Sequence, residues 1–161
     1  MKNILLSIIF YFLFSSLSYA GACLTTIAAA STNQLACADD DILNVTSAGS
    51  ITYNDHKAVD LESTSGVQIT NDGTIQTEDG TSKQKAIHAL SSLNTTITNN
   101  GTINSDNNEG IILDYAENVI ITNNAGATIS AEGNNAISGR NVGNCHFNGA
   151  NCHADLSGQS N

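Results

Sequence analysis

The chain has 161 residues and a formal net charge of −10, with 15 Asp and Glu against five Lys and Arg. A chain this acidic has no electrostatic footprint for nucleic acid or anionic lipid, so we expect no nucleic-acid partner. It contains no proline, which suits a strand-rich fold because proline cannot donate to a β-ladder.

Residues 1–20 have the three parts of a secretory signal peptide. Lys2 supplies the positive start, Ile4–Phe14 the apolar middle, and the sequence SYA at 18–20 a small-x-small cleavage site. The apolar run is shorter than the roughly 20 residues that span a bilayer, so we expect no membrane span after cleavage. A lipoprotein signal ending before Cys23 is the alternative, but the leucine usually found three residues ahead of such a cysteine is missing.

Residues 21–44 are predicted to cap the N-terminal end of the repeats that follow. Cys23 and Cys37 flank a Thr-, Ala- and Ser-rich segment, and export makes a disulfide between them plausible. Closing a loop of about 15 residues stabilises a fold by roughly 3 kcal/mol. The acids Asp39–Asp41 could bind calcium, but the spacing of known calcium loops is missing, so a solvated charge run is favoured.

Residues 45–139 repeat one pattern. It is clearest in TTITNNGTI at Thr95–Ile103, and similar stretches lie at Leu43–Ile51, Val67–Ile75 and Val119–Ile129. The aligned anchors are 24, 28 and 24 residues apart: Val45, Ile69, Ile97 and Ile121. A period of this length is the mark of a solenoid, with length variation confined to the corners.

Apolar residues alternate with polar ones in each repeat, over short β-branched runs bounded by Asn, Asp and Gly. This pattern predicts strands joined by turns, and equivalent strands of successive coils must stack in parallel. We therefore expect an all-β, right-handed parallel β-helix of about four coils. The anchors above form one core column, and two more are expected: Val59, Ile87, Ile111 and Ile137; and Ile51, Ile75, Ile103 and Ile129.

Asparagines recur at one corner of the coils. Asn71, Asn99 and Asn123 occupy equivalent places, and their amides are expected to form a hydrogen-bonded ladder with a structural role. The glycines of Asn71–Gly73 and Asn99–Gly101 are expected to serve backbone angles with φ > 0.

The outward positions of the coils offer few candidate catalytic residues. Asp60 aligns with His88 in the next coil, but an exposed pair of this kind would add little to the stability of the fold. Asp114 aligns with Leu90, so neither column holds two acids in neighbouring coils, as glycosidic hydrolysis would require. The remaining acids of interest lie in corner loops: Glu78, Asp79, Asp106 and Glu109.

Residues 140–161 break the pattern. Cys145-His146 and Cys152-His153 could hold zinc, but six residues separate the thiols, so a disulfide between Cys145 and Cys152 is favoured. No further coil covers the last one, and we expect the chain to be cut short there.

The signal peptide, the cysteine-bounded start and the ITNNGTI and ITNDGTI repeats together resemble the N-terminal passenger segment of bacterial autotransporters, over about residues 21–139. The resemblance implies a secreted or surface-exposed β-helix followed by an outer-membrane β-barrel translocator. No series of alternating barrel strands follows these coils, so we expect that translocator to be missing and a periplasmic location if the chain is truncated.

Three function classes remain open. The first is a non-catalytic structural or adhesin-like module that contacts host cells, surface glycans or its own copies. The second is a polysaccharide lyase or hydrolase, because many such enzymes use this fold. The third is an inert truncated fragment. Scattered basic residues and few aromatics favour the first class, with no enzyme activity and no cofactor.

Overall fold

The computed structural model describes residues 21–78, 84–132, 134–148 and 150–151. The signal peptide predicted for residues 1–20 therefore lies outside the described residues, as does Cys152. All regular structure in the described ranges is β-strand. These described ranges contain no helix long and apolar enough to cross a membrane.

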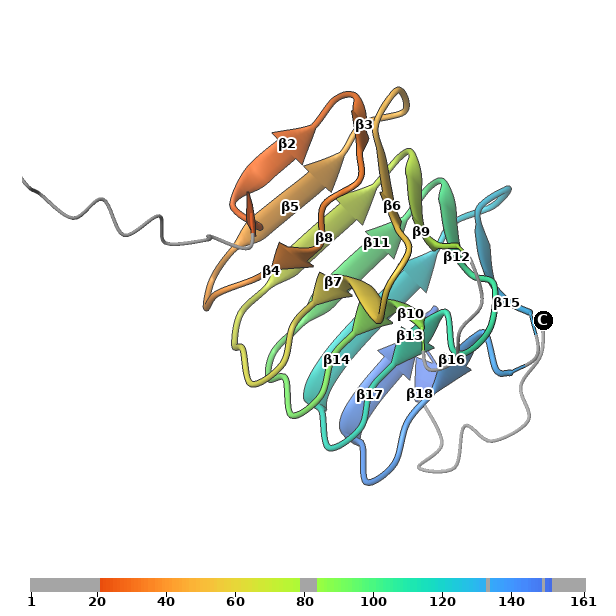
Figure 1. The fold of residues 1–161 in the computed structure, drawn as a ribbon. Helices are drawn as coiled ribbons and strands as arrows, with labels where there is room; N and C mark the ends of the chain where they lie inside the picture. The colour runs from red at the N-terminus through yellow and green to blue at the C-terminus, as the bar shows by residue number, and fades with distance from the viewer. Residues whose placement is uncertain (1–20, 79–83, 133, 149, 152–161) are drawn as a thin grey trace, which may run out of the picture.

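The strands stack into three sheets, which we name A, B and C (Figure 1). Sheet A contains β1 (Gly21–Ala22), β4 (Leu35–Ala36), β7 (Lys57–Asp60), β10 (Lys85–His88), β13 (Ile111–Ile112) and β16 (Ile137–Ser138). Sheet B contains β2 (Thr25–Ile27), β5 (Ile42–Val45), β8 (Gln68–Asn71), β11 (Thr96–Asn99), β14 (Glu117–Asn123), β17 (Gly143–Phe147) and β18 (Ala150–Asn151). Sheet C contains β3 (Ala30–Ser31), β6 (Ser50–Tyr53), β9 (Thr74–Thr77), β12 (Thr102–Ser105) and β15 (Thr128–Ala131).

The chain visits sheets B, C and A in turn, and each such circuit is one coil. The four coils β5–β7, β8–β10, β11–β13 and β14–β16 confirm the predicted parallel β-solenoid of about four turns. The described strands pair in parallel, apart from β18, which is antiparallel to β17. The segment predicted as a cap adds the short strands β2, β3 and β4 to the three sheets, so it is itself built as a turn of the solenoid.

Two of the three predicted core columns are confirmed. In sheet A, Val59 pairs with Ile87, Ile87 with Ile111, and Ile111 with Ile137. In sheet C, the column of Ile51, Ile75, Ile103 and Ile129 follows the predicted register. These side chains are buried, Ile137 only partly, and they form the centre of the apolar core.

The sheet B column was predicted wrongly in its first coil. Leu43, not Val45, pairs with Ile69, and Val45 lies level with Asn71. The corner between β5 and β6 is two residues longer than assumed, like the corner between β14 and β15. Leu43 and Val45 both point into the core, so alternation alone cannot distinguish the two registers.

The corner asparagines form a ladder inside the solenoid. Asn71 Nδ2 donates to Asn99 Oδ1 at 2.8 Å, and Asn99 Nδ2 donates to Asn123 Oδ1 at 2.8 Å. Both donors also reach a main-chain carbonyl of the next coil, at Thr102 and Thr128, over 3.0 Å. Asn71 and Asn99 are fully buried, so these bonds replace contacts that water would otherwise make.

The glycines beside this ladder serve a purpose other than the one predicted. Neither Gly73 nor Gly101 has a positive φ. A Cβ on Gly101 would lie 2.1 Å from the carbonyl oxygen of Gly73, so the glycine is needed because successive coils approach closely. Left-handed backbone occurs instead at the corner between sheets A and B, for example at Ser91 and Asn94, whose φ values are 54° and 51°.

A disulfide joins Cys23 to Cys37, with their Cα atoms 4.6 Å apart. Cys23 is fully buried, so the bond ties the first turn to the core. Cys145 is also buried, in β17, but its predicted partner Cys152 lies outside the described residues. The second pair therefore stays a prediction.

Candidate functional site

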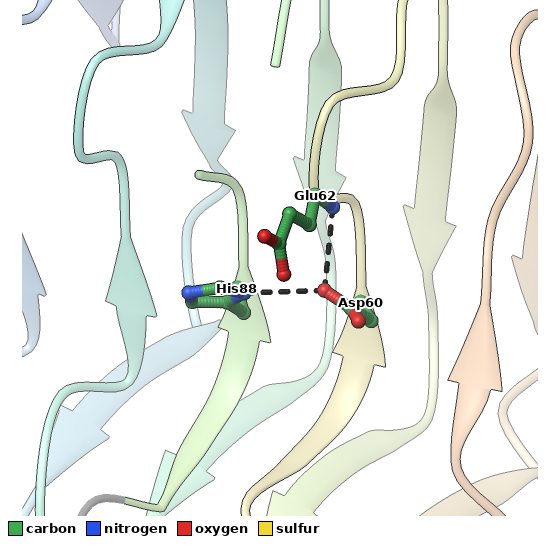
Figure 2. Close-up of side chains that lie close together, drawn as sticks. All are labelled: Asp60, Glu62 and His88. Carbon is green, nitrogen blue, oxygen red and sulfur yellow. Dashed lines mark hydrogen bonds and ion pairs between the residues drawn. The ribbon is translucent and has the colours of Figure 1, made fainter. Parts of the chain in front are cut away.

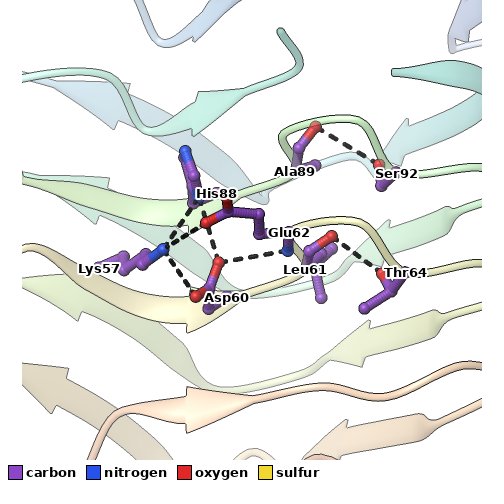
Figure 3. A network of polar contacts seen from close by, with 8 residues as sticks. All are labelled: Lys57, Asp60, Leu61, Glu62, Thr64, His88, Ala89 and Ser92. Atoms are coloured by element: carbon purple, nitrogen blue, oxygen red, sulfur yellow. Dashed lines mark hydrogen bonds and ion pairs between the residues drawn. The ribbon is translucent and has the colours of Figure 1, made fainter. Parts of the chain in front are cut away.

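The densest group of ionisable side chains in the described part of the chain lies on sheet A. It consists of Lys57, Asp60, Glu62 and His88, which we name the sheet A cluster (Figure 3). Lys57, Asp60 and Glu62 come from one coil and His88 comes from the next. Figure 2 shows Asp60 and Glu62 beside His88. The sequence had paired only Asp60 with His88.

Local strand geometry brings these groups together. Ala58 and Val59 both point into the core, so Lys57 and Asp60, at the two ends of β7, both face outward. The register of β7 and β10 places His88 directly beside Asp60, as predicted. Glu62 lies in the following corner, where its main-chain N–H donates to Asp60 Oδ1 at 3.2 Å.

The Lys57 ammonium lies at the centre of the cluster. Its Nζ is 2.6 Å from Asp60 Oδ2, 3.3 Å from Glu62 Oε2 and 3.3 Å from His88 Nδ1. His88 Nδ1 is also 3.1 Å from Asp60 Oδ1. With His88 neutral, one ammonium faces two carboxylates, so the cluster carries one uncompensated negative charge.

The cluster is less exposed than the sequence suggested. The side chains of His88 and Asp60 are 14% and 18% exposed, and that of Lys57 is 21% exposed. Burial alone would raise the pKa of Asp60, but its hydrogen bonding with His88 and Lys57 outweighs this effect, so the pKa lies below its ordinary value. Asp60 is therefore held ionised by its neighbours.

A second ion pair joins coils on the same sheet. Arg140 donates from Nε to Asp114 Oδ2 at 3.1 Å and from its main-chain N–H to Asp114 Oδ1 at 3.0 Å. Burial raises the pKa of Asp114, but the hydrogen bonds from Arg140 lower it by more, so the pKa lies below its ordinary value. The Asp114 side chain is 8% exposed, whereas that of Arg140 is 77% exposed. The guanidinium therefore lies over a nearly buried carboxylate.

A row of acids at the end of sheet C was missed by the sequence alignment. Glu78, Asp106 and Glu132 each donate their main-chain N–H to the preceding coil at equivalent positions, so they stack one per coil. Neighbouring parallel strands lie about 4.8 Å apart. Equal spacing from the end of each sheet C strand was the signal that could have found this row. A hollow of about 390 Å³ lies at the Glu78 end, lined also by Tyr53 and Asp55.

The acids Asp39–Asp41 make contacts within the fold. Asp39 Oδ1 accepts from the main-chain N–H of Ser65 at 2.9 Å, and Asp41 Oδ2 accepts from that of Ala38 at 2.8 Å. Asp41 is only 8% exposed, so the expectation of a fully solvated run was wrong for this residue. Its carboxylate satisfies the backbone of a turn.

Comparison of the chain with family models, with curated proteins and with solved structures finds no match in any of the three. The β-solenoid architecture therefore rests on the strand register and the repeats described above.

Proposed function

We propose that this chain is an exported, non-catalytic β-solenoid segment with a structural or cell-surface contact role, of the kind found in autotransporter passengers. One observation carries the proposal: the strands of sheets B and C contain a single charged residue, Glu117. Their outward positions hold mostly Thr, Ser, Asn and Gln. Repeated uncharged faces suit contact and spacing better than acid–base chemistry.

The ionisable groups on sheet A support the same conclusion. General acid–base catalysis needs carboxyls whose pKa values are poised near the working pH. Asp60 and Asp114 are instead held ionised by Lys57 and Arg140. The acid row of Glu78, Asp106 and Glu132 is the strongest ground for a lyase or hydrolase, and it is the part of the molecule that an activity test must address.

The Cys23–Cys37 disulfide supports export, because such bonds persist mainly in oxidising compartments. The test of export uses the full chain expressed in a Gram-negative host. We expect a mature product beginning at Gly21 and located outside the cytoplasm. A variant with Ile9→Asp in the apolar segment is the matched control, and it should retain the leader in the cytoplasm. Wild-type protein that keeps Met1–Ala20 would contradict export.

The test of the non-catalytic role is an assay of the exported protein against acidic polysaccharides, with and without calcium. We expect no turnover. A variant carrying Asp106→Ala and Glu109→Ala, together with a second carrying Glu132→Ala, is the control for trace contaminants. Turnover that is present in the wild type and lost in either variant would replace this proposal with a carbohydrate-active enzyme.

A further inference from the structure

The sheet A cluster interrupts the repeat, whereas the asparagine ladder follows it. The asparagine ladder recurs from coil to coil. The column that holds Asp60 and His88 has Ala36 before it and Ile112 after it, so the charged pair occurs once. An unrepeated group of ionisable side chains is the feature that a specific binding site would add to a uniform scaffold.

The three possible ligands converge on one cation. One oxygen or nitrogen atom each from Asp60, Glu62 and His88 lies within 4.8 Å of the other two. Lys57 Nζ contacts all three residues, over 2.6 to 3.3 Å. An ammonium has donors only, so each partner must offer it a lone pair. Lys57 thus stands in for a compact bound cation.

The ring nitrogen of His88 has conflicting neighbours. To accept from the Lys57 ammonium, Nδ1 must be unprotonated; to donate to the Asp60 carboxylate, the same atom must carry a proton. A neutral imidazole satisfies only one of them at a time. A metal ion removes this conflict, because it takes the Nδ1 lone pair and a carboxylate oxygen together.

One ligand–ligand distance fits a tetrahedral metal of zinc's size. Zinc binds histidine nitrogen at about 2.0–2.1 Å and carboxylate oxygen at about 2.0–2.2 Å, so two such ligands lie about 3.3 Å apart. Asp60 Oδ1 and His88 Nδ1 are 3.1 Å apart. The Glu62 side chain is 49% exposed, so it has room to move to a third position, and water can take the fourth.

We propose that Asp60, Glu62 and His88 form a binding site for one divalent transition-metal ion, zinc being the best match, and that the Lys57 ammonium is its built-in competitor. One imidazole and two carboxylates suit zinc, and the single negative charge left on the cluster favours a cation. On binding, Lys57 moves its flexible stem toward solvent. This proposal is independent of the proposed function.

The experiment is a titration of the purified protein with Zn²⁺ in competition with a chromophoric chelator. We expect one saturable equivalent. His88→Gln and Asp60→Asn should abolish it, and Lys57→Met should tighten it by about tenfold or more, since it removes the competing charge. His146→Gln, which removes an imidazole from sheet B, is the matched control and should leave the affinity unchanged. Circular dichroism and melting of each variant establish that it is folded.

Three results would overturn the proposal. The first is wild-type protein with no saturable zinc equivalent, whatever Lys57→Met does. The second is equal binding by wild type and a folded His88→Gln variant, which would indicate adventitious surface binding. The third is loss of the equivalent in His146→Gln, which would place the metal on sheet B. As a readout at the residue itself, zinc should shift the imidazole NMR signals of His88 and not those of His146.

Discussion

Asn71 and Asn99 lie 28 residues apart in the sequence, and their fully buried side chains share a hydrogen bond of 2.8 Å from Nδ2 to Oδ1. The main chain fixes the orientation of both amides. The N–H of Gly73 donates to Asn71 Oδ1 at 3.2 Å, and that of Gly101 donates to Asn99 Oδ1 at 3.3 Å. Each amide therefore bonds to the main chain of its own corner and to the asparagine of the next coil.

Asn99→Ala should destabilise the protein by about 2–4 kcal/mol, because it leaves several buried donors and acceptors without partners. Urea unfolding followed by circular dichroism measures the loss. Asn100→Ala is the control, because its hydrogen bonds with Asp72 and Asn124 are exposed to solvent, and it should change stability by no more than about 1 kcal/mol. Equal losses for the two variants would show that burial of the ladder contributes nothing special.

Gly101→Ala should cost more than the usual exchange of glycine for alanine. Its Cβ would lie 2.1 Å from the Gly73 carbonyl oxygen, so the backbone of two coils must separate. We expect a loss of about 2 kcal/mol or more in the free energy of unfolding.

The matched control for that variant is Ala127→Gly in the fourth coil. Ala127 holds the place of Gly101, since its carbonyl accepts from Asn123 Nδ2 as that of Gly101 accepts from Asn99 Nδ2. The side chain at this place in the fourth coil is thus already a methyl group. We expect a loss of about 0.5–1 kcal/mol from backbone entropy alone. A Gly101→Ala variant as stable as wild type would contradict the close approach of the coils.

Acid should weaken the protein through Asp114. Its pKa is depressed in the folded state, so its contribution is complete above the ordinary aspartate value of about 3.9 and is lost as the pH falls through the lower folded value. In Asp114→Asn the free energy of unfolding should therefore fall less steeply below about pH 4 than in wild type. Chemical unfolding at a series of pH values measures the slopes. Asp55→Asn, at an exposed corner, should keep the wild-type slope; a steep slope retained in Asp114→Asn would be the contrary result.

Reduction of the Cys23–Cys37 bond should lower the free energy of unfolding by about 2–4 kcal/mol, since the closed loop constrains the unfolded chain. Unfolding curves of wild type and of a Cys23→Ser, Cys37→Ser variant, with and without reductant, measure it. Mass spectrometry of unreduced peptides tests both predicted pairs at once. Free thiols at Cys145 and Cys152 would show that only the first pairing is right.

The sequence was sufficient for the architecture because each coil repeats the apolar anchors of the one before. Ile75, Ile103 and Ile129 are unmistakable in such an alignment, and the structure stacks them. The first coil was misaligned at Val45 because two inward residues of similar character compete for one column. A period of two residues determines which face of the strand a side chain occupies. It does not distinguish two strand registers that differ by two residues.

The sheet A cluster was predictable only in part, for a related reason. Asp60 and His88 occupy the same column and could be paired by counting. Lys57 and Glu62 join them through the direction of a lysine stem and the bend of a corner, neither of which leaves a periodic trace. The acid row of Glu78, Asp106 and Glu132 was predictable, because each acid directly follows a sheet C strand, but only the outward columns of sheet A had been compared for stacked acids.

Confining insertions to corners has an evolutionary consequence. Duplicating one coil copies both the donor and the acceptor side of its sheet contacts, so the new unit fits between its parents without a redesigned core. Gain or loss of a whole unit then changes the length of the rod and leaves its cross-section alone. Selection on the length of the solenoid can thus act almost independently of selection on its stability.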